Sequence, residues 1–91
     1  MHPPPLALRQ SVATFAQAME EKLRENDYKG GWKGCDMQYL SMRLTQEREE
    51  LRKAVERGDP TEVLREAADV ANFCMMIAEK VARDVEPPFQ H

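Results

Sequence analysis

The sequence predicts an all-α protein made of three helices, and three observations favour this fold class. Apolar residues recur at intervals of three and four along three long stretches. No stretch alternates between apolar and polar residues over a useful length, as a half-buried strand would. The 91 residues are 42% hydrophobic and 32% charged, a composition typical of a soluble globular domain. We therefore expect one domain over residues 1–91 and no β-sheet.

The first helix is expected over about residues 6–26, after a proline run at residues 3–5. The segment 26–36 reads NDYKGGWKGCD, and its three glycines indicate a loop. The helix itself is indicated by apolar residues at helical spacing, which are Leu8, Val12, Phe15, Met19 and Leu23.

Two further helices are expected over about residues 36–57 and 60–84. Asp36 suits the N-cap of the second helix, and Gly58 suits the left-handed conformation that follows its last turn. The segment DPTE at residues 59–62 combines an N-cap, a proline at the first helical position and a glutamate at the third. This combination is a strong start signal for the third helix.

The third helix carries two neighbouring apolar stripes, which predict how the chain assembles. Together they cover well over a third of the helix circumference, more than one neighbouring helix can bury. We therefore expect a homodimer in which helices from two chains form a common bundle, with a monomeric three-helix bundle as the alternative. The stripes consist of Val63, Ala67, Val70, Cys74, Ile77 and Val81, and of Leu64, Ala68, Ala71, Met75, Ala78 and Ala82.

Composition argues against several classes of function. The net charge of −3 does not favour binding to a nucleic acid polymer. No apolar run approaches the ~18 residues that a membrane helix needs, and the first five residues do not resemble a secretory signal. We therefore expect a cytoplasmic protein without a membrane partner. Cys35 and Cys74 fit neither a disulfide framework nor a zinc site, and His2 and His91 stand near the chain ends.

Four carboxylates form the candidate catalytic and metal site. Glu47 interrupts an otherwise apolar seam of the second helix, and Glu50 follows one turn later on the same side. Glu66 and Asp69 repeat this spacing at the border of the apolar face of the third helix. Two antiparallel helices could direct all four at one point, where a hard cation such as Mg²⁺ or Mn²⁺ would neutralise them. The alternative is that these acids are solvated or form ordinary ion pairs along their helices.

The glycine-rich loop and the third helix supply candidate substrate-binding residues. Lys29 and Lys33 suit phosphate, and Trp32, the only tryptophan, suits stacking on a nucleobase. Asn72, one turn after Asp69, suits a sugar or a base. The alternatives are that Trp32 plugs the end of the bundle, that the lysines are merely solvated and that Asn72 lies on the surface.

The segments QEREEL (46–51) and EAADVAN (66–72) resemble the MazG-like nucleotide pyrophosphohydrolases of the all-α NTP pyrophosphatase superfamily. That family carries Glu-Glu-x-x-Glu on one helix and Glu-x-x-Asp on the next, and the resemblance covers roughly residues 26–82. It implies that the chain is one MazG-like domain that hydrolyses a (deoxy)nucleoside triphosphate between the α and β phosphates. The products would be a monophosphate and pyrophosphate, and the role would be the removal of non-standard or surplus nucleotides.

The resemblance also implies roles for individual residues and a partner. One carboxylate of the second helix, Glu47 or Glu50, would accept the proton of the attacking water. Family members are homodimers or dimers of dimers, in agreement with the wide apolar face of the third helix. By position, the Mg²⁺ or Mn²⁺ ligands would be Glu47, Glu50, Glu66 and Asp69, and the substrate would contact Lys29, Trp32, Lys33 and Asn72.

One position departs from the family pattern, because Gln46 stands where the family has its first glutamate. If the family uses this position for a metal or for the base, the protein would bind fewer ions or turn over slowly. The competing hypothesis is a non-catalytic helical dimer that acts as an interaction or nucleotide-sensing module.

Overall fold

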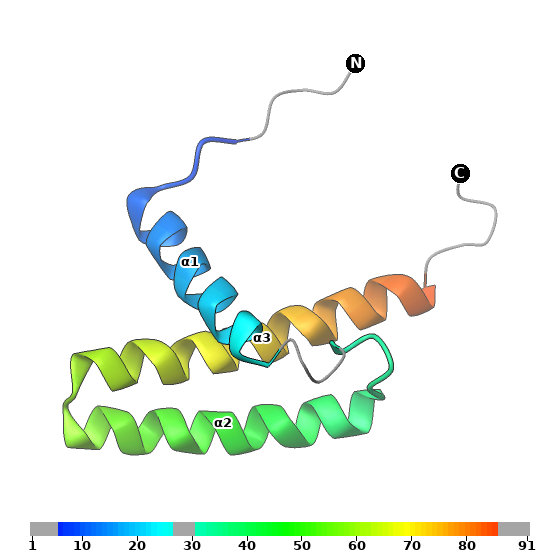
Figure 1. The fold of residues 1–91 in the computed structure, drawn as a ribbon. Coiled ribbons are helices and arrows are strands. Elements are labelled where there is room, and N and C mark those ends of the chain that lie inside the picture. The colour runs from blue at the N-terminus through cyan, green and yellow to red at the C-terminus, as the bar shows by residue number, and fades with distance from the viewer. Residues whose placement is uncertain (1–5, 27–30, 86–91) are drawn as a thin grey trace.

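The computed structural model describes residues 6–26 and 31–85. These residues form three α-helices and no strand, so the prediction of an all-α fold is confirmed for the described chain (Figure 1). The helices are α1 (Gln10–Glu25), α2 (Met37–Arg57) and α3 (Pro60–Val85). Their bounds lie within one residue of the expected ones, except at the start of α1.

Helices α2 and α3 form an antiparallel hairpin, and α1 packs across α3 on another side (Figure 1). In the described chain α1 contacts α3 but not α2. The N-terminal end of α1 projects away from the hairpin, whereas its C-terminal end approaches the middle of α3 (Figure 1). The second half of α1 is therefore the part that faces the rest of the chain.

Local hydrogen bonds explain where the hairpin helices begin and end. The Asp36 carboxylate accepts a hydrogen bond from the N–H of Tyr39 at 2.8 Å, which caps α2. Gly58 has a φ of 76°, so a residue without a side chain suits the end of α2. The Asp59 carboxylate accepts from the N–H of Thr61 at 3.0 Å and starts α3.

Helix α1 begins at Gln10, four residues later than the expected start. Its N-cap, Arg9, makes no side-chain hydrogen bond to the first turn. Leu6 and Leu8 are 89% and 63% exposed, so they gain little from packing. Because no capping side chain and no packing contact would stabilise an additional turn, the helix does not extend before Gln10.

The buried apolar core is small and is formed by residues of α2 and α3. Its members are Leu40, Ala54, Ala68 and Met76, and α1 contributes no buried residue. Large apolar side chains remain exposed on all three helices, including Val12, Val55 and Val81. None of the helices in the described chain combines the length and the apolar character that crossing a membrane requires.

Candidate functional site

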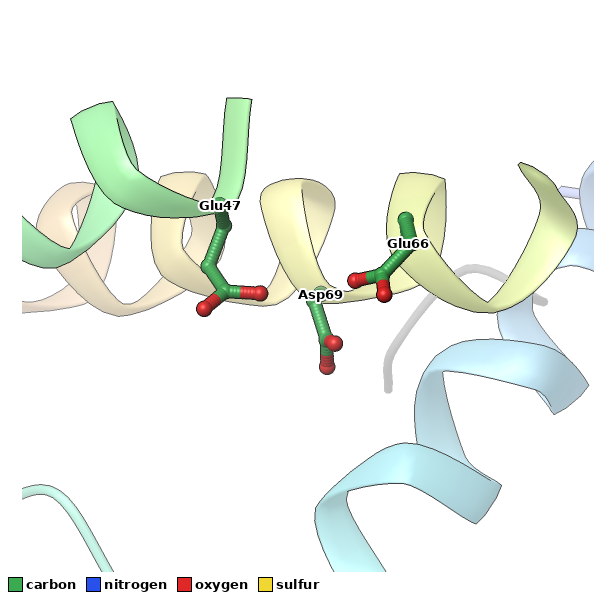
Figure 2. Close-up of side chains that lie close together, drawn as sticks. All are labelled: Glu47, Glu66 and Asp69. Carbon is green, nitrogen blue, oxygen red and sulfur yellow. The ribbon is translucent and has the colours of Figure 1, made fainter. Parts of the chain in front are cut away.

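Three carboxylates from the hairpin converge on one point. Glu47 reaches from α2, and Glu66 and Asp69 lie on α3 (Figure 2). Each offers an oxygen atom, and these oxygens all lie within 4.8 Å of one another. All three residues are half-buried. The hairpin therefore brings acids from two helices together in a partly desolvated position.

Helical periodicity explains why Glu47 faces α3. Leu40 and Ala54 lie seven residues before and after it, and they are only 1% and 0% exposed. Residues seven apart share a face of a helix, so Glu47 lies on the buried seam of α2. Its side chain is 12% exposed, as expected for a residue at this position.

Glu50, the fourth predicted acid, is not one of the three converging residues. Its side chain is 46% exposed and lies 3.5 Å from the Lys53 ammonium, measured from Oε2 to Nζ. Its charge nevertheless reaches the cluster, because it contributes to the raised pKa of Glu66. Glu50 thus lies at the margin of the site rather than in it.

Burial and, after it, the crowding of like charges perturb the pKa values of the two acids of α3. The pKa of Asp69 lies above its ordinary value because burial disfavours the charged form, an effect that Lys22 opposes and Glu47 increases. The pKa of Glu66 is also raised, by burial first and then by the charges of Asp69 and Glu47. A cation placed among these carboxylates would relieve both effects.

Two cations of the chain already contact the cluster, and the sequence analysis identified neither. The Lys22 Nζ atom of α1 lies 3.3 Å from both an Asp69 oxygen and a Glu25 oxygen. The Arg43 Nη2 atom donates to Glu47 Oε2 at 2.8 Å, and the guanidinium carbon lies 5.1 Å from the centre of the Phe73 ring. The spacing of four residues could have indicated the Arg43 pair, but nothing local links residues 22 and 69.

A cavity of about 460 Å³ opens beside the carboxylates, between the three helices and residues 31–35. Its walls include two of the converging acids, Glu47 and Asp69. The loop contributes Trp32 and Cys35, and α3 contributes Asn72 together with apolar side chains. The acidic cluster therefore borders a space of the size that a small-molecule ligand requires.

Asn72 is a buried polar residue in the wall of this cavity, with an exposed fraction of 3%. Its Nδ2 atom donates to the Met19 carbonyl oxygen of α1 at 3.0 Å. Its Oδ1 atom is buried and has no hydrogen-bond partner among the described residues, and the same holds for Arg43 Nε. Unpaired buried polar atoms are costly, so their presence in one cavity wall is typical of a binding site. The alternative of a surface position for Asn72 is wrong.

The loop residues differ in how they relate to the cavity. Trp32 is half-buried in its wall, and the indole Nε1 donates to Glu79 Oε1 at 3.1 Å. Lys33 is exposed and does not line the cavity. Lys29, the other predicted phosphate contact, lies outside the described residues.

The three carboxylates form an all-oxygen donor set, which is the chemistry that Mg²⁺ and Mn²⁺ prefer in proteins. The raised pKa values of Glu66 and Asp69, and the short separations among the three carboxylates, fit a position that a divalent cation would stabilise. Comparison with protein-family models, with characterised proteins and with solved structures gave no significant match. Any function assigned to the chain therefore depends on the chemistry of its own residues.

Proposed function

We propose that the protein is a Mg²⁺-dependent nucleoside triphosphate pyrophosphohydrolase, as its resemblance to the MazG-like enzymes implies. The reaction would cleave a (deoxy)nucleoside triphosphate between the α and β phosphates to give a monophosphate and pyrophosphate. One observation carries the proposal: three carboxylates converge at the edge of a cavity that also holds Trp32 and an incompletely bonded Asn72. In a site for a nucleoside triphosphate, carboxylates can bind the metal, an aromatic ring can stack on the base, and a polar group can bond to the sugar or the base.

In this proposal Glu47, Glu66 and Asp69 hold Mg²⁺, or Mn²⁺ in its place. The metal would neutralise phosphate oxygens and lower the pKa of the attacking water. Glu50 could complete the ligand set after leaving Lys53, since an exposed ion pair costs little to break. Either Glu47 or Glu50 would accept the proton of the water.

The remaining residues of the cavity would bind and orient the nucleotide. The Trp32 indole offers a face for the base, and Asn72 Oδ1 offers an acceptor to a sugar hydroxyl or a base N–H. Outside the cavity lining, the resemblance implies that Lys33, and Lys29 beyond the described residues, would contact the phosphates. Arg43 donates a hydrogen bond to Glu47 and would orient that carboxylate.

Gln46, which replaces a glutamate of the family pattern, is exposed and is not part of the converging cluster. A neutral amide is also a weaker ligand for a hard cation than a carboxylate. We therefore expect the protein to hold fewer metal ions, or to turn over more slowly, than a chain with a glutamate at this position.

The proposed assembly is a homodimer or a dimer of dimers in the cytoplasm. Exposed apolar side chains on α1 and α3 support it, among them Val12, Leu64 and Val81. One side of α1 carries four apolar residues over two turns, which are Val12, Phe15, Ala16 and Met19. Pairing of such surfaces between two chains would bury them.

A second candidate function is a non-catalytic helical dimer that binds partners or senses nucleotides. The ion pairs of Lys22 with Asp69 and of Arg43 with Glu47 favour it, because they stabilise two of the three carboxylates without a metal. The substitution Glu47→Leu separates the two candidates. A scaffold would gain thermal stability from it, whereas an enzyme would lose metal binding and activity.

The proposal is tested by pyrophosphate release from a panel of ribo- and deoxyribonucleoside triphosphates, with and without Mg²⁺. We expect Mg²⁺-dependent release that is lost in Asp69→Asn, a variant that keeps the shape of the side chain. The matched control is Glu49→Gln, because Glu49 is an exposed acid of α2 that pairs with Arg52. No release from any triphosphate by the folded protein would favour the non-catalytic dimer.

A further inference from the structure

Trp32 is hydrogen-bonded to a residue far along the chain, Glu79. The indole N–H of Trp32 donates to Glu79 Oε1 at 3.1 Å, across 47 positions of sequence. The other hydrogen bonds made by the described part of this loop are local. The N–H of Cys35 donates to the Trp32 carbonyl at 3.0 Å, and Asp36 caps the helix that follows it. The bond to Glu79 is therefore the one hydrogen bond between residues 31–36 and α3 in the described chain.

Glu79 lies on the same stripe of α3 as the candidate site. Residues 69, 72, 76 and 79 follow one another at intervals of three and four, so they share one side of the helix. The stripe begins with Asp69, continues through Asn72 and Met76, and ends at Glu79. Asp69, Asn72, Met76 and Trp32 all line the cavity. Glu79 therefore meets the indole about three helical turns beyond Asp69 along α3.

The chemistry of Glu79 suits a positioning role. An indole N–H can only donate, and a carboxylate can only accept, so the pair has a single direction. The Glu79 side chain is 49% exposed, and among the described residues it pairs with Arg83, whose Nη1 atom lies 3.9 Å from Oε1. This separation is too long for a direct hydrogen bond, so Oε1 remains available to the indole.

We infer that Glu79 is a positioning residue, which fixes the Trp32 indole in the cavity wall so that its ring can stack on the base of a nucleotide. The identity of the stacked group rests on the proposed function, whereas the orientation of the indole by Glu79 does not. Glu79 itself contacts neither the carboxylate cluster nor the metal that the cluster would hold.

The test uses the fluorescence of Trp32, the only tryptophan of the chain. In Glu79→Ala we expect a red-shifted emission and an acrylamide quenching constant raised by about twofold, because loss of the hydrogen bond frees the ring. Glu79→Gln keeps an acceptor oxygen and should restore most of the quenching protection. Asp84→Asn is the matched control, since Asp84 is an exposed acid of α3 that pairs with Lys80.

A second measurement relates the indole to its ligand. Binding of a non-hydrolysable nucleoside triphosphate analogue in Mg²⁺ should weaken by about fivefold in Glu79→Ala, in the range expected of one lost hydrogen bond. Where turnover is measured, KM should rise while kcat stays close to its original value, and Glu79→Gln should restore KM. Unchanged quenching in Glu79→Ala would overturn the positioning role. Absence of analogue binding by the unmodified protein would instead overturn the proposed nucleotide site.

Discussion

The α2–α3 hairpin and helix α1 differ in what holds them in place. The hairpin has side-chain caps at Asp36 and Asp59, and it contains every buried apolar residue of the described chain. Helix α1 has no side-chain cap and no buried residue, and Leu6 and Leu8 before it are largely exposed. Helix α1 contributes two polar contacts to the site: Lys22 pairs with Asp69, and the Met19 carbonyl accepts a hydrogen bond from Asn72. The comparison shows that the helix with the least packing completes the site that the hairpin begins.

The largest expected difference between the two regions concerns stability. Ala54→Asp would place an unpaired carboxylate at a position that is 0% exposed, so we expect the free energy of unfolding to fall by about 3 kcal/mol or more. Gln17→Asp, at an exposed position of α1, should change it by less than about 0.5 kcal/mol. Urea unfolding followed by circular dichroism measures both. Equal losses would show that α1 is as tightly packed as the hairpin.

The second prediction concerns the stability that the hairpin gains when its carboxylate cluster binds Mg²⁺. If the cluster binds Mg²⁺, saturation at 100 times the Kd should add about 2.7 kcal/mol to the free energy of unfolding near pH 7.5. Near pH 4 the gain should be small, because protonated carboxylates are poor ligands. Calorimetric melting at the two pH values measures the effect. An equal gain at both values would place the Mg²⁺ effect outside the cluster.

Two acids of the cluster, Asp69 and Glu66, should make the stability of the metal-free protein depend on pH, and the sign follows from their raised pKa values. The pKa values of Asp69 and Glu66 are raised in the folded state from the ordinary 3.8 and 4.5. Their contribution to stability is therefore fully present below the unfolded values and is lost as pH rises through the folded ones. Asp69→Asn should reduce this loss between pH 4 and neutral pH, relative to the unmodified protein in a chelator. A parallel pair of melting curves would contradict the prediction.

Substitution of Lys22 tests whether its ammonium group, which α1 supplies, competes with a metal ion for the carboxylate cluster. In Lys22→Met, the half-buried Asp69 loses its ion pair, so the metal-free protein should lose on the order of 1 kcal/mol of stability. Mg²⁺ should bind more tightly to the variant, because it no longer displaces an ammonium group. Titration calorimetry measures the affinity, and Arg24→Met, which removes the exposed partner of Glu20 on the same helix, is the control. Weaker Mg²⁺ binding in Lys22→Met would assign Lys22 a supporting role instead.

The smallest effect is expected from repairing the start of α1. Arg9 is an N-cap without a capping side chain, so Arg9→Asp should stabilise the helix by about 0.5–1 kcal/mol. Hydrogen exchange of the first turn of α1 should slow, while exchange in α2 and α3 should not change. Faster exchange throughout α1 would show that Arg9 already has a stabilising role.

Local patterns in the sequence predict most of this fold. Capping residues and apolar spacing act over one or two helical turns, so the bounds of α2 and α3 follow closely from the residues themselves. The late start of α1 was not predicted, because apolar spacing before Gln10 says nothing about whether a partner covers it. The convergence of Glu47 with Glu66 and Asp69 follows from their places on two seams, once the hairpin is antiparallel.

The sequence by itself determined the three helices, their caps and the acids that lie on the faces between them. The tertiary structure decided which distant groups meet these acids: Lys22 with Asp69, and Trp32 with Glu79. It also buried Asn72 against α1 and left Glu50 at the margin of the cluster. The physical reason is range, since a helix forms through contacts three and four residues apart. The crossing of α1 over α3 and the path of the loop depend instead on packing along the whole chain.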